Sequence, residues 1–244
     1  SDSLLYHMAR VVHWAQDGSL RHYGTAYGHQ LWNPPFAETA ILTLRTLWGG
    51  DRPANLVQWS AMVGVLVAVS GIGRLLGLGR RGRFLAVALA ASIPMTVLQA
   101  TSTQNDLVTA FWLSAAAAFV LLGRSVRLGW LESVGVGLVL GLGLLTKGTF
   151  YVFGLPVALW FVFTRPWRSE ARRSLIQLAI IGISVLVLNL GAWSRNLAVA
   201  DTPLGPSTWV GGHSSISVAS LKPRVALLPV RLLRGLAPHL SGPW

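Results

Sequence analysis

Ionisable side chains are sparse in this chain, and several stand where long apolar stretches begin or end. Only 11% of the residues are charged, whereas 52% are hydrophobic. A charge at membrane depth is costly and usually faces a cavity or a partner. The ionisable residues with such positions are Asp2, Glu38, Asp106, Lys147 and Arg195. These carboxylates and cations share one side of the predicted bundle, which predicts a polar pocket at one membrane surface.

The apolar residues that must position this pocket form six segments, each roughly long enough to cross about 30 Å of hydrocarbon. The segments are 55–78, 84–100, 107–123, 128–146, 149–164 and 174–193. More polar loops, 1–54 and 194–244, precede and follow them. The sequence therefore predicts an all-α fold, a polytopic bundle of transmembrane helices with an outward loop that contains short interfacial helices.

Arginines mark which side of the membrane each connection faces. Every second connection is basic, with Arg74, Arg80, Arg81 and Arg83, then Arg124 and Arg127, then Arg165, Arg168, Arg172 and Arg173. The positive-inside rule places these connections in the cytoplasm and the polar pocket on the outer face. The net charge of +12 thus reflects membrane topology and does not predict a nucleic-acid partner.

The polar segment before the first span has the pattern of a folded cap. Apolar residues recur at helical spacing through residues 4–16, which predicts an amphipathic helix at the outer surface. A second helix is predicted over residues 36–48, after Pro34 and Pro35. Because both helices are short and charged, neither is expected to cross the membrane.

Small residues and prolines predict where the helices pack and bend. Gly73 with Gly77, and Gly137 with Gly141, are spaced for close helix approach. Proline inside a helical run produces a kink, and this is expected at residues 94 and 156. Near the inner side, Glu132 is predicted to be an ion-pair partner of Arg124 or Arg127.

A series of short polar motifs occurs in order along the chain. The motifs are Asp2-Ser3-Leu4-Leu5-Tyr6-His7 with Arg10, Pro35 with Glu38, Thr101-Ser102-Thr103-Gln104-Asn105-Asp106, Leu145-Thr146-Lys147-Gly148-Thr149, Arg195-Asn196 and Thr202-Pro203-Leu204-Gly205-Pro206. This series resembles the C-type integral-membrane glycosyltransferases, and it is similar to motifs in bacterial members of the dolichyl-phosphate-mannose protein mannosyltransferase family, including aminoarabinose and galacturonosyl transferases.

The resemblance implies transfer of a sugar from a polyprenyl-phosphate carrier to an acceptor hydroxyl on the extracytoplasmic face, by inverting displacement. Asp2 occupies the position of the family's general base, which takes the proton of the attacking hydroxyl. The resemblance implies that cations stabilise the departing phosphate. The implied substrate-binding residues are Tyr6, His7, Arg10, Glu38, Asp106, Lys147 and Arg195.

Simpler roles remain open for four of these residues. Asp2 and Asp106 stand where a carboxylate could cap a helix. Lys147 could extend its ammonium group to the outer interface, and Arg195 could bind lipid head groups. A multi-spanning transporter or lipid flippase is the alternative function, because such proteins also have outward charges and proline-broken helices.

The remaining expectations concern cofactors, partners and location. No metal-ligand spacing is evident among His7, His13, His22, His29, His213 and His239. No cofactor is identified, and the need for a divalent metal ion stays open. The expected partners are membrane lipid and the polyprenyl-phosphate sugar, and the resemblance implies a bacterial inner membrane. The chain is expected to be a fragment of a larger enzyme, because relatives have a helix before the first loop and a terminal soluble domain.

Overall fold

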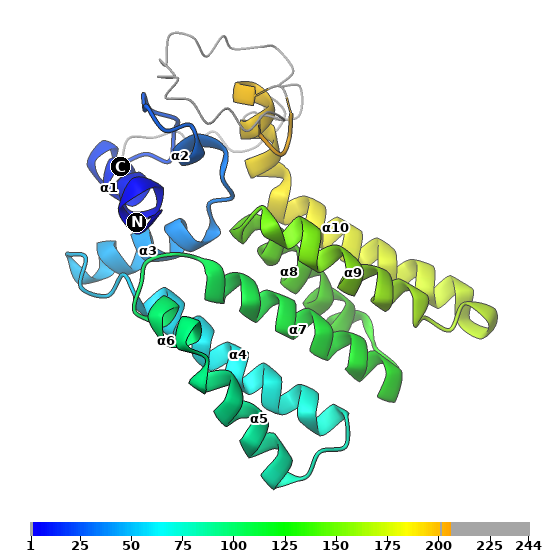
Figure 1. Ribbon diagram of the computed structural model, residues 1–244. Helices are drawn as coiled ribbons and strands as arrows, with labels where there is room; N and C mark the ends of the chain where they lie inside the picture. The colour runs from blue at the N-terminus through cyan, green and yellow to red at the C-terminus, as the bar shows by residue number, and fades with distance from the viewer. Residues whose placement is uncertain (1, 201, 206–244) are drawn as a thin grey trace. The chain divides into compact units, whose positions relative to one another are not determined.

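The computed structural model describes residues 2–200 and 202–205, and their regular elements are helices (Figure 1). The all-α class predicted from the sequence is therefore confirmed. Contacts divide the described chain into two units: the loop unit, residues 2–33 with 190–205, and the helix unit, Pro34–Asn189. The predicted outer loop beyond residue 205, with His213 and His239, lies outside the described residues.

The helix unit begins with α3, Phe36–Trp48, and continues through α4, Leu56–Leu75, and α5, Arg80–Ser92. The elements that follow are α6, Pro94–Ala100, α7, Asp106–Ser125, α8, Trp130–Thr146, α9, Thr149–Phe163, and α10, Trp167–Ala200, which belongs to this unit as far as Asn189. Helix α7 packs against α4, α8 and α9 (Figure 1). A core of Val120, Leu128, Val136, Phe161 and Ile181 holds α7–α10 together.

The six predicted apolar segments are helical, and the second, 84–100, is divided between α5 and α6. Among the described residues, α4, α7 and Trp167–Ala198 of α10 are long and apolar enough to cross a membrane, and the bent pair α5–α6 could form a fourth span. The apolar helices α8 and α9 have 17 and 15 residues. That these two also cross stays a prediction, as does the surface position of residues 4–16 and 36–48.

Proline explains the bend in the second predicted span. Pro94 begins α6, and the axes of α5 and α6 differ by 66°. Ile93 before it is extended, at φ −62° and ψ 117°, because the proline ring disfavours a helical conformation in the preceding residue. The kink expected at this position is confirmed, whereas Pro156 lies inside the continuous helix α9.

The two glycine pairs differ in what they do. A Cβ atom on Gly137 would lie 2.6 Å from Ser184 Cβ, and one on Gly141 would lie 2.6 Å from Leu188 Cδ1, so this pair allows α8 and α10 to approach closely. The prediction for Gly77 is wrong. Its φ is +85°, it lies in the turn after α4, and a Cβ added there would meet no atom within 4 Å, so glycine serves the turn.

Acidic residues at the predicted inner ends of the helices also differ from expectation. The Glu132 carboxylate accepts a hydrogen bond of 2.8 Å from the Gly129 N–H and so caps α8. Arg127 instead forms an ion pair with Glu170, at 2.7 Å. The backbone N–H groups at the start of α8 have no acceptor within the helix, and Glu132 lies close enough in sequence to accept from one of them. The ion-pair partner of Arg127 is therefore a residue distant in sequence, Glu170.

The loop unit consists of short helices and the end of α10. A π-helical turn, Ser3–His7, leads into α1, Met8–Asp17, which ends at Gly18 in a left-handed conformation. Helix α2, His29–Trp32, follows an irregular segment. The helix predicted over residues 4–16 is thus present, although its first turn is π-helical. Asn196 of α10 donates to the backbone carbonyls of Trp32 and Pro203, both at 3.0 Å.

Candidate functional site

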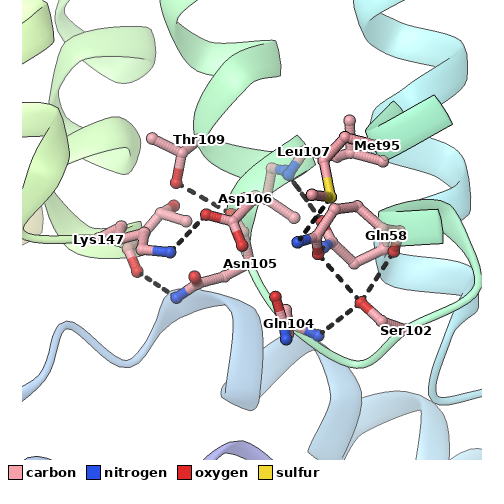
Figure 2. Close-up of polar contacts among 12 residues, drawn as sticks. Gln58, Met95, Ser102, Gln104, Asn105, Asp106, Leu107, Thr109 and Lys147 are labelled. Carbon is pink, nitrogen blue, oxygen red and sulfur yellow. Dashed lines mark hydrogen bonds and ion pairs between the residues drawn. The ribbon is translucent and has the colours of Figure 1, made fainter. Parts of the chain in front are cut away.

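In the helix unit, two sequence-predicted site residues meet where α7 begins and α8 ends (Figure 2). Asp106 is the first residue of α7, and Lys147 follows the last residue of α8. The Lys147 ammonium group donates to Asp106 Oδ1 and forms an ion pair with it. Asn105 Nδ2 adds a bond of 2.9 Å to the carbonyl of Thr146. Two short motifs that are far apart in the sequence are therefore joined.

Gln58, which the sequence analysis missed, holds the start of α7 from the neighbouring helix α4. Its side-chain oxygen accepts hydrogen bonds from the backbone N–H group of Leu107, at 3.0 Å (Figure 2), and from that of Val108, at 3.2 Å. These amides lack partners within α7, since the first turn of a helix has no preceding carbonyls. Gln58 is fully buried. The sequence feature that could have indicated this role is a glutamine within an otherwise apolar helix.

A polar chain extends from Gln58 to the connection between α6 and α7. Gln58 Nε2 donates to Gln99 Oε1 at 3.3 Å, and Ser102 Oγ donates to the Gln99 backbone carbonyl at 2.9 Å. Ser102 Oγ in turn accepts from the Gln104 N–H, at 3.2 Å. The predicted motif of residues 101–106 thus forms a hydrogen-bonded turn that fixes the position of Asp106 (Figure 2).

Glu38 is the third predicted site residue of the helix unit. It lies in the first turn of α3 and is fully buried. Helix α3 packs against α4 and α8. The position near a helix N-terminus favours a carboxylate, because the helix dipole is positive there. Its predicted role in substrate binding stays a prediction.

The loop unit holds the other predicted residues, and Arg10 is buried among backbone carbonyls. Its Nε donates to the carbonyl of Gln30 at 2.7 Å, and its Nη2 donates to those of Leu31, at 3.2 Å, and Asn33, at 2.8 Å. The guanidinium group also lies 5.1 Å from the ring centre of Trp14. Arg10 therefore ties α1 to the segment around α2 and contributes a buried positive charge.

Arg195 lies beside a histidine that sequence reasoning did not assign to the site. Its Nη2 is 3.3 Å from Nδ1 of His22. Arginine cannot accept a hydrogen bond, so Nδ1 is the acceptor and the ring proton is on Nε2. Nε2 is buried and has no hydrogen-bond partner within the described residues. Burial, followed by the charges of Arg195 and Arg10, lowers the pKa of His22 to about 4.

The first residues of the loop unit place the predicted base and two aromatic neighbours. Asp2 is exposed immediately before the π-helical turn and makes no capping hydrogen bond through its side chain. Tyr6 and the buried His7 have ring centres 3.8 Å apart. The capping role left open for Asp2 is therefore not observed. Asp106 does not occupy the cap position either, because Asn105 precedes α7 there.

The described part of the chain contains no cluster of side chains that could bind a metal ion. No three His, Asp or Glu side chains within residues 2–200 and 202–205 lie close enough together to hold an ion. Two of the predicted site residues, Asp106 and Lys147, form an ion pair, whereas a third, Arg195, contacts the neutral His22.

Comparison with known proteins identifies the family. No curated protein and no solved structure matches the chain. The family described as dolichyl-phosphate-mannose-protein mannosyltransferase matches residues 34–193, a range that includes Glu38, Asp106 and Lys147. This match covers most of the chain and agrees with its apolar helices. The chain therefore belongs to the dolichyl-phosphate-mannose-protein mannosyltransferase family and is a multi-pass membrane glycosyltransferase of the mannosyltransferase type.

Proposed function

We propose that the protein transfers a sugar from a polyprenyl-phosphate carrier to an acceptor hydroxyl of a lipid, glycan or protein on the extracytoplasmic face. Family membership supports the transfer of a sugar, and the alternation of basic connections supports the outward orientation. In this orientation, Asp106, Lys147 and Arg195 are near outer helix ends, so the site would face away from the cytoplasm.

The observation that carries the proposal is the group formed by Arg195 and His22, whose Nη2 and Nδ1 atoms are 3.3 Å apart. Burial, followed by the charges of Arg195 and Arg10, lowers the pKa of this histidine, and its Nε2–H is a buried donor without a partner within the described residues. A carrier phosphate would accept that hydrogen bond and a charge-assisted one from Arg195. We assign the phosphate to this group, because the charge of Lys147 is already balanced by Asp106.

The proposed reaction is a single displacement. The Asp2 carboxylate takes the proton of the acceptor hydroxyl while the hydroxyl oxygen attacks the anomeric carbon. The bond between that carbon and the phosphate oxygen breaks, its electron pair leaves with the phosphate, and the configuration inverts. Arg195 and His22 stabilise the charge that develops on the departing phosphate. The exposed Asp2 side chain, which caps no helix, supports this role for the carboxylate.

The residues of the helix unit receive a different role in this proposal. Asp106 and Lys147 hold the start of α7 to the end of α8, and Gln58 fixes the same turn from α4. These contacts hold the 101–106 turn in place against α4 and α8. Glu38, Tyr6 and His7 are proposed contacts of the sugar or the acceptor.

Binding of a radiolabelled polyprenyl-phosphate sugar to the full-length protein tests the phosphate assignment. Arg195→Gln should weaken donor binding about tenfold to a hundredfold, since a hydrogen bond to a charged group contributes about 1.5–3 kcal/mol. Arg21→Gln is the matched control, because Arg21 is an exposed arginine of the same unit. Equal donor binding by Arg195→Gln and wild type would contradict the assignment of the phosphate to Arg195. A wild-type protein that binds the donor but transfers no sugar would favour the transporter alternative.

A further inference from the structure

The helix unit contains a cavity of about 720 Å³ that has no part in the proposed transfer. Its walls come from the start of α8 and from the bend near Glu170 of α10, and they include Arg127, Trp130, Glu170, Arg172, Arg173 and Ile176. Trp130 begins α8, whereas Lys147 follows its end. At 1.5 Å per residue, the 17-residue helix separates the cavity from the Asp106–Lys147 pair by about 25 Å. The cavity therefore lies at the predicted cytoplasmic end of the bundle.

Hydrogen bonds between distant segments build one wall of this cavity. The carbonyl oxygen of Leu128 accepts from Arg173 Nη2, at 2.8 Å, and from Gln177 Nε2, at 2.7 Å. Leu128 itself is a core residue with 1% exposure. The connection between α7 and α8 is thus anchored to α10 beside the cavity.

The charges at the cavity are unbalanced. Its three arginines face one carboxylate, that of Glu170, which pairs with Arg127 at 2.7 Å and with Arg173 at 3.3 Å. Arg172 is exposed at the cavity and forms no ion pair within residues 2–200 and 202–205. Arg127 is also largely exposed, with 79% of its side chain accessible. The cavity therefore presents positive charge that an anionic group could neutralise.

Part of the remaining lining is apolar and exposed. Trp130 is 67% exposed and Ile176 is 51% exposed, and Ile180 continues the same wall. Tryptophan is favoured at the membrane interface, where its ring contacts the region between head groups and chains. A soluble anion would use only the arginines, whereas a molecule with a phosphate and a hydrocarbon chain would contact both parts of the lining.

We propose that this cavity binds an anionic phospholipid of the cytoplasmic leaflet. Arg172 and Arg127 contact the headgroup phosphate, while Trp130 and Ile176 contact the upper part of an acyl chain. Basic groups at the cytoplasmic surface attract anionic lipid head groups electrostatically. The bound lipid would bridge the α7–α8 connection and the first turns of α10.

Lipid titration of the full-length protein in neutral detergent, followed by native mass spectrometry, tests this proposal. The probes are phosphatidylglycerol, phosphatidylcholine and inorganic phosphate. We expect Arg127→Gln combined with Arg172→Gln to weaken phosphatidylglycerol binding about tenfold or more, and to leave phosphatidylcholine binding unchanged. Arg80→Gln combined with Arg81→Gln is the matched control, because these exposed arginines belong to another basic connection. This control should bind phosphatidylglycerol as the wild type does.

Three outcomes would overturn the proposal. The control could lose as much affinity as the cavity variant, which would indicate a diffuse charge effect, or the cavity variant could bind phosphatidylglycerol normally. Inorganic phosphate could displace the lipid at equal concentration, which would indicate a soluble anion. The single change Arg172→Gln guards against misfolding, because it breaks no ion pair of the described structure, and it should weaken phosphatidylglycerol binding with an unchanged melting temperature.

Discussion

The ammonium group of Lys147, at the end of α8, donates to the carboxylate of Asp106, at the start of α7 (Figure 2). The two side chains are partly exposed, at 27% and 41%. This contact joins two of the motifs by which the chain resembles its family, and it changes what each residue can do. A lysine that is already paired is a weaker candidate for a phosphate ligand than Arg195, whose partner His22 is neutral.

A double-mutant cycle on Asp106→Asn and Lys147→Met tests the pairing. We expect both single changes to reduce sugar transfer by a similar factor, and the double variant to be no worse than either, because the same link is lost each time. The effect on the free energy of unfolding should be no more than about 1 kcal/mol, since the pair is partly exposed. Additive losses of transfer activity would show that the residues act separately.

Gln58→Leu should be more damaging to stability than any change in the ion pair. It removes the acceptor of two buried N–H groups, those of Leu107 and Val108. Each unsatisfied buried group costs about 1–3 kcal/mol, so the melting temperature should fall clearly. Ser60→Ala is the control on the same helix, because Ser60 bonds only to the carbonyl of Val57 in its own turn. Equal melting temperatures for the two variants would refute the role of Gln58.

The titration of His22 predicts a pH dependence of stability. Its pKa is about 4 in the folded protein, below the usual 6.5, so an unfolded chain binds this proton at a higher pH. Stability should therefore be full above about pH 6.5 and should decline as the pH falls towards 4, relative to a His22→Gln variant. Melting temperatures of both proteins across this range measure the difference. A bound polyprenyl-phosphate sugar should raise the pKa of His22, so a pH dependence that the donor leaves unchanged would argue against phosphate at this site.

Close packing of α8 on α10 gives a fourth prediction. Gly137→Ala would place a Cβ 2.6 Å from Ser184 Cβ and 3.1 Å from the Ile181 carbonyl oxygen, so backbone must move. We expect a loss of about 1–3 kcal/mol in the free energy of unfolding. Gly182→Ala is the control in the same helix pair, because a Cβ there meets nothing within 4 Å. Equal free energies of unfolding for the two variants would contradict close packing of α8 on α10 at Gly137.

Features set by local sequence could be predicted, whereas features set by distant contacts could not. Long apolar runs and Pro94 predicted the helices and the bend, because hydrophobic length and the proline ring act locally. The partners of Gln58 and His22 lie 49 and 173 positions away, at Leu107 and Arg195, and the sequence carries no sign of such pairings. Gly77 was misassigned because spacing alone does not distinguish a packing glycine from one at positive φ.

The most direct test of the account is sugar transfer by full-length protein that carries Asp2→Asn. The amide has nearly the shape of the carboxylate but cannot take the acceptor's proton. Turnover of a radiolabelled polyprenyl-phosphate sugar should fall about a hundredfold to ten-thousandfold, while donor binding stays as in the wild type. Asp17→Asn, an exposed aspartate at the end of α1, should transfer sugar normally. Turnover above about a tenth of the wild-type value in Asp2→Asn would contradict the assignment of Asp2 as the general base.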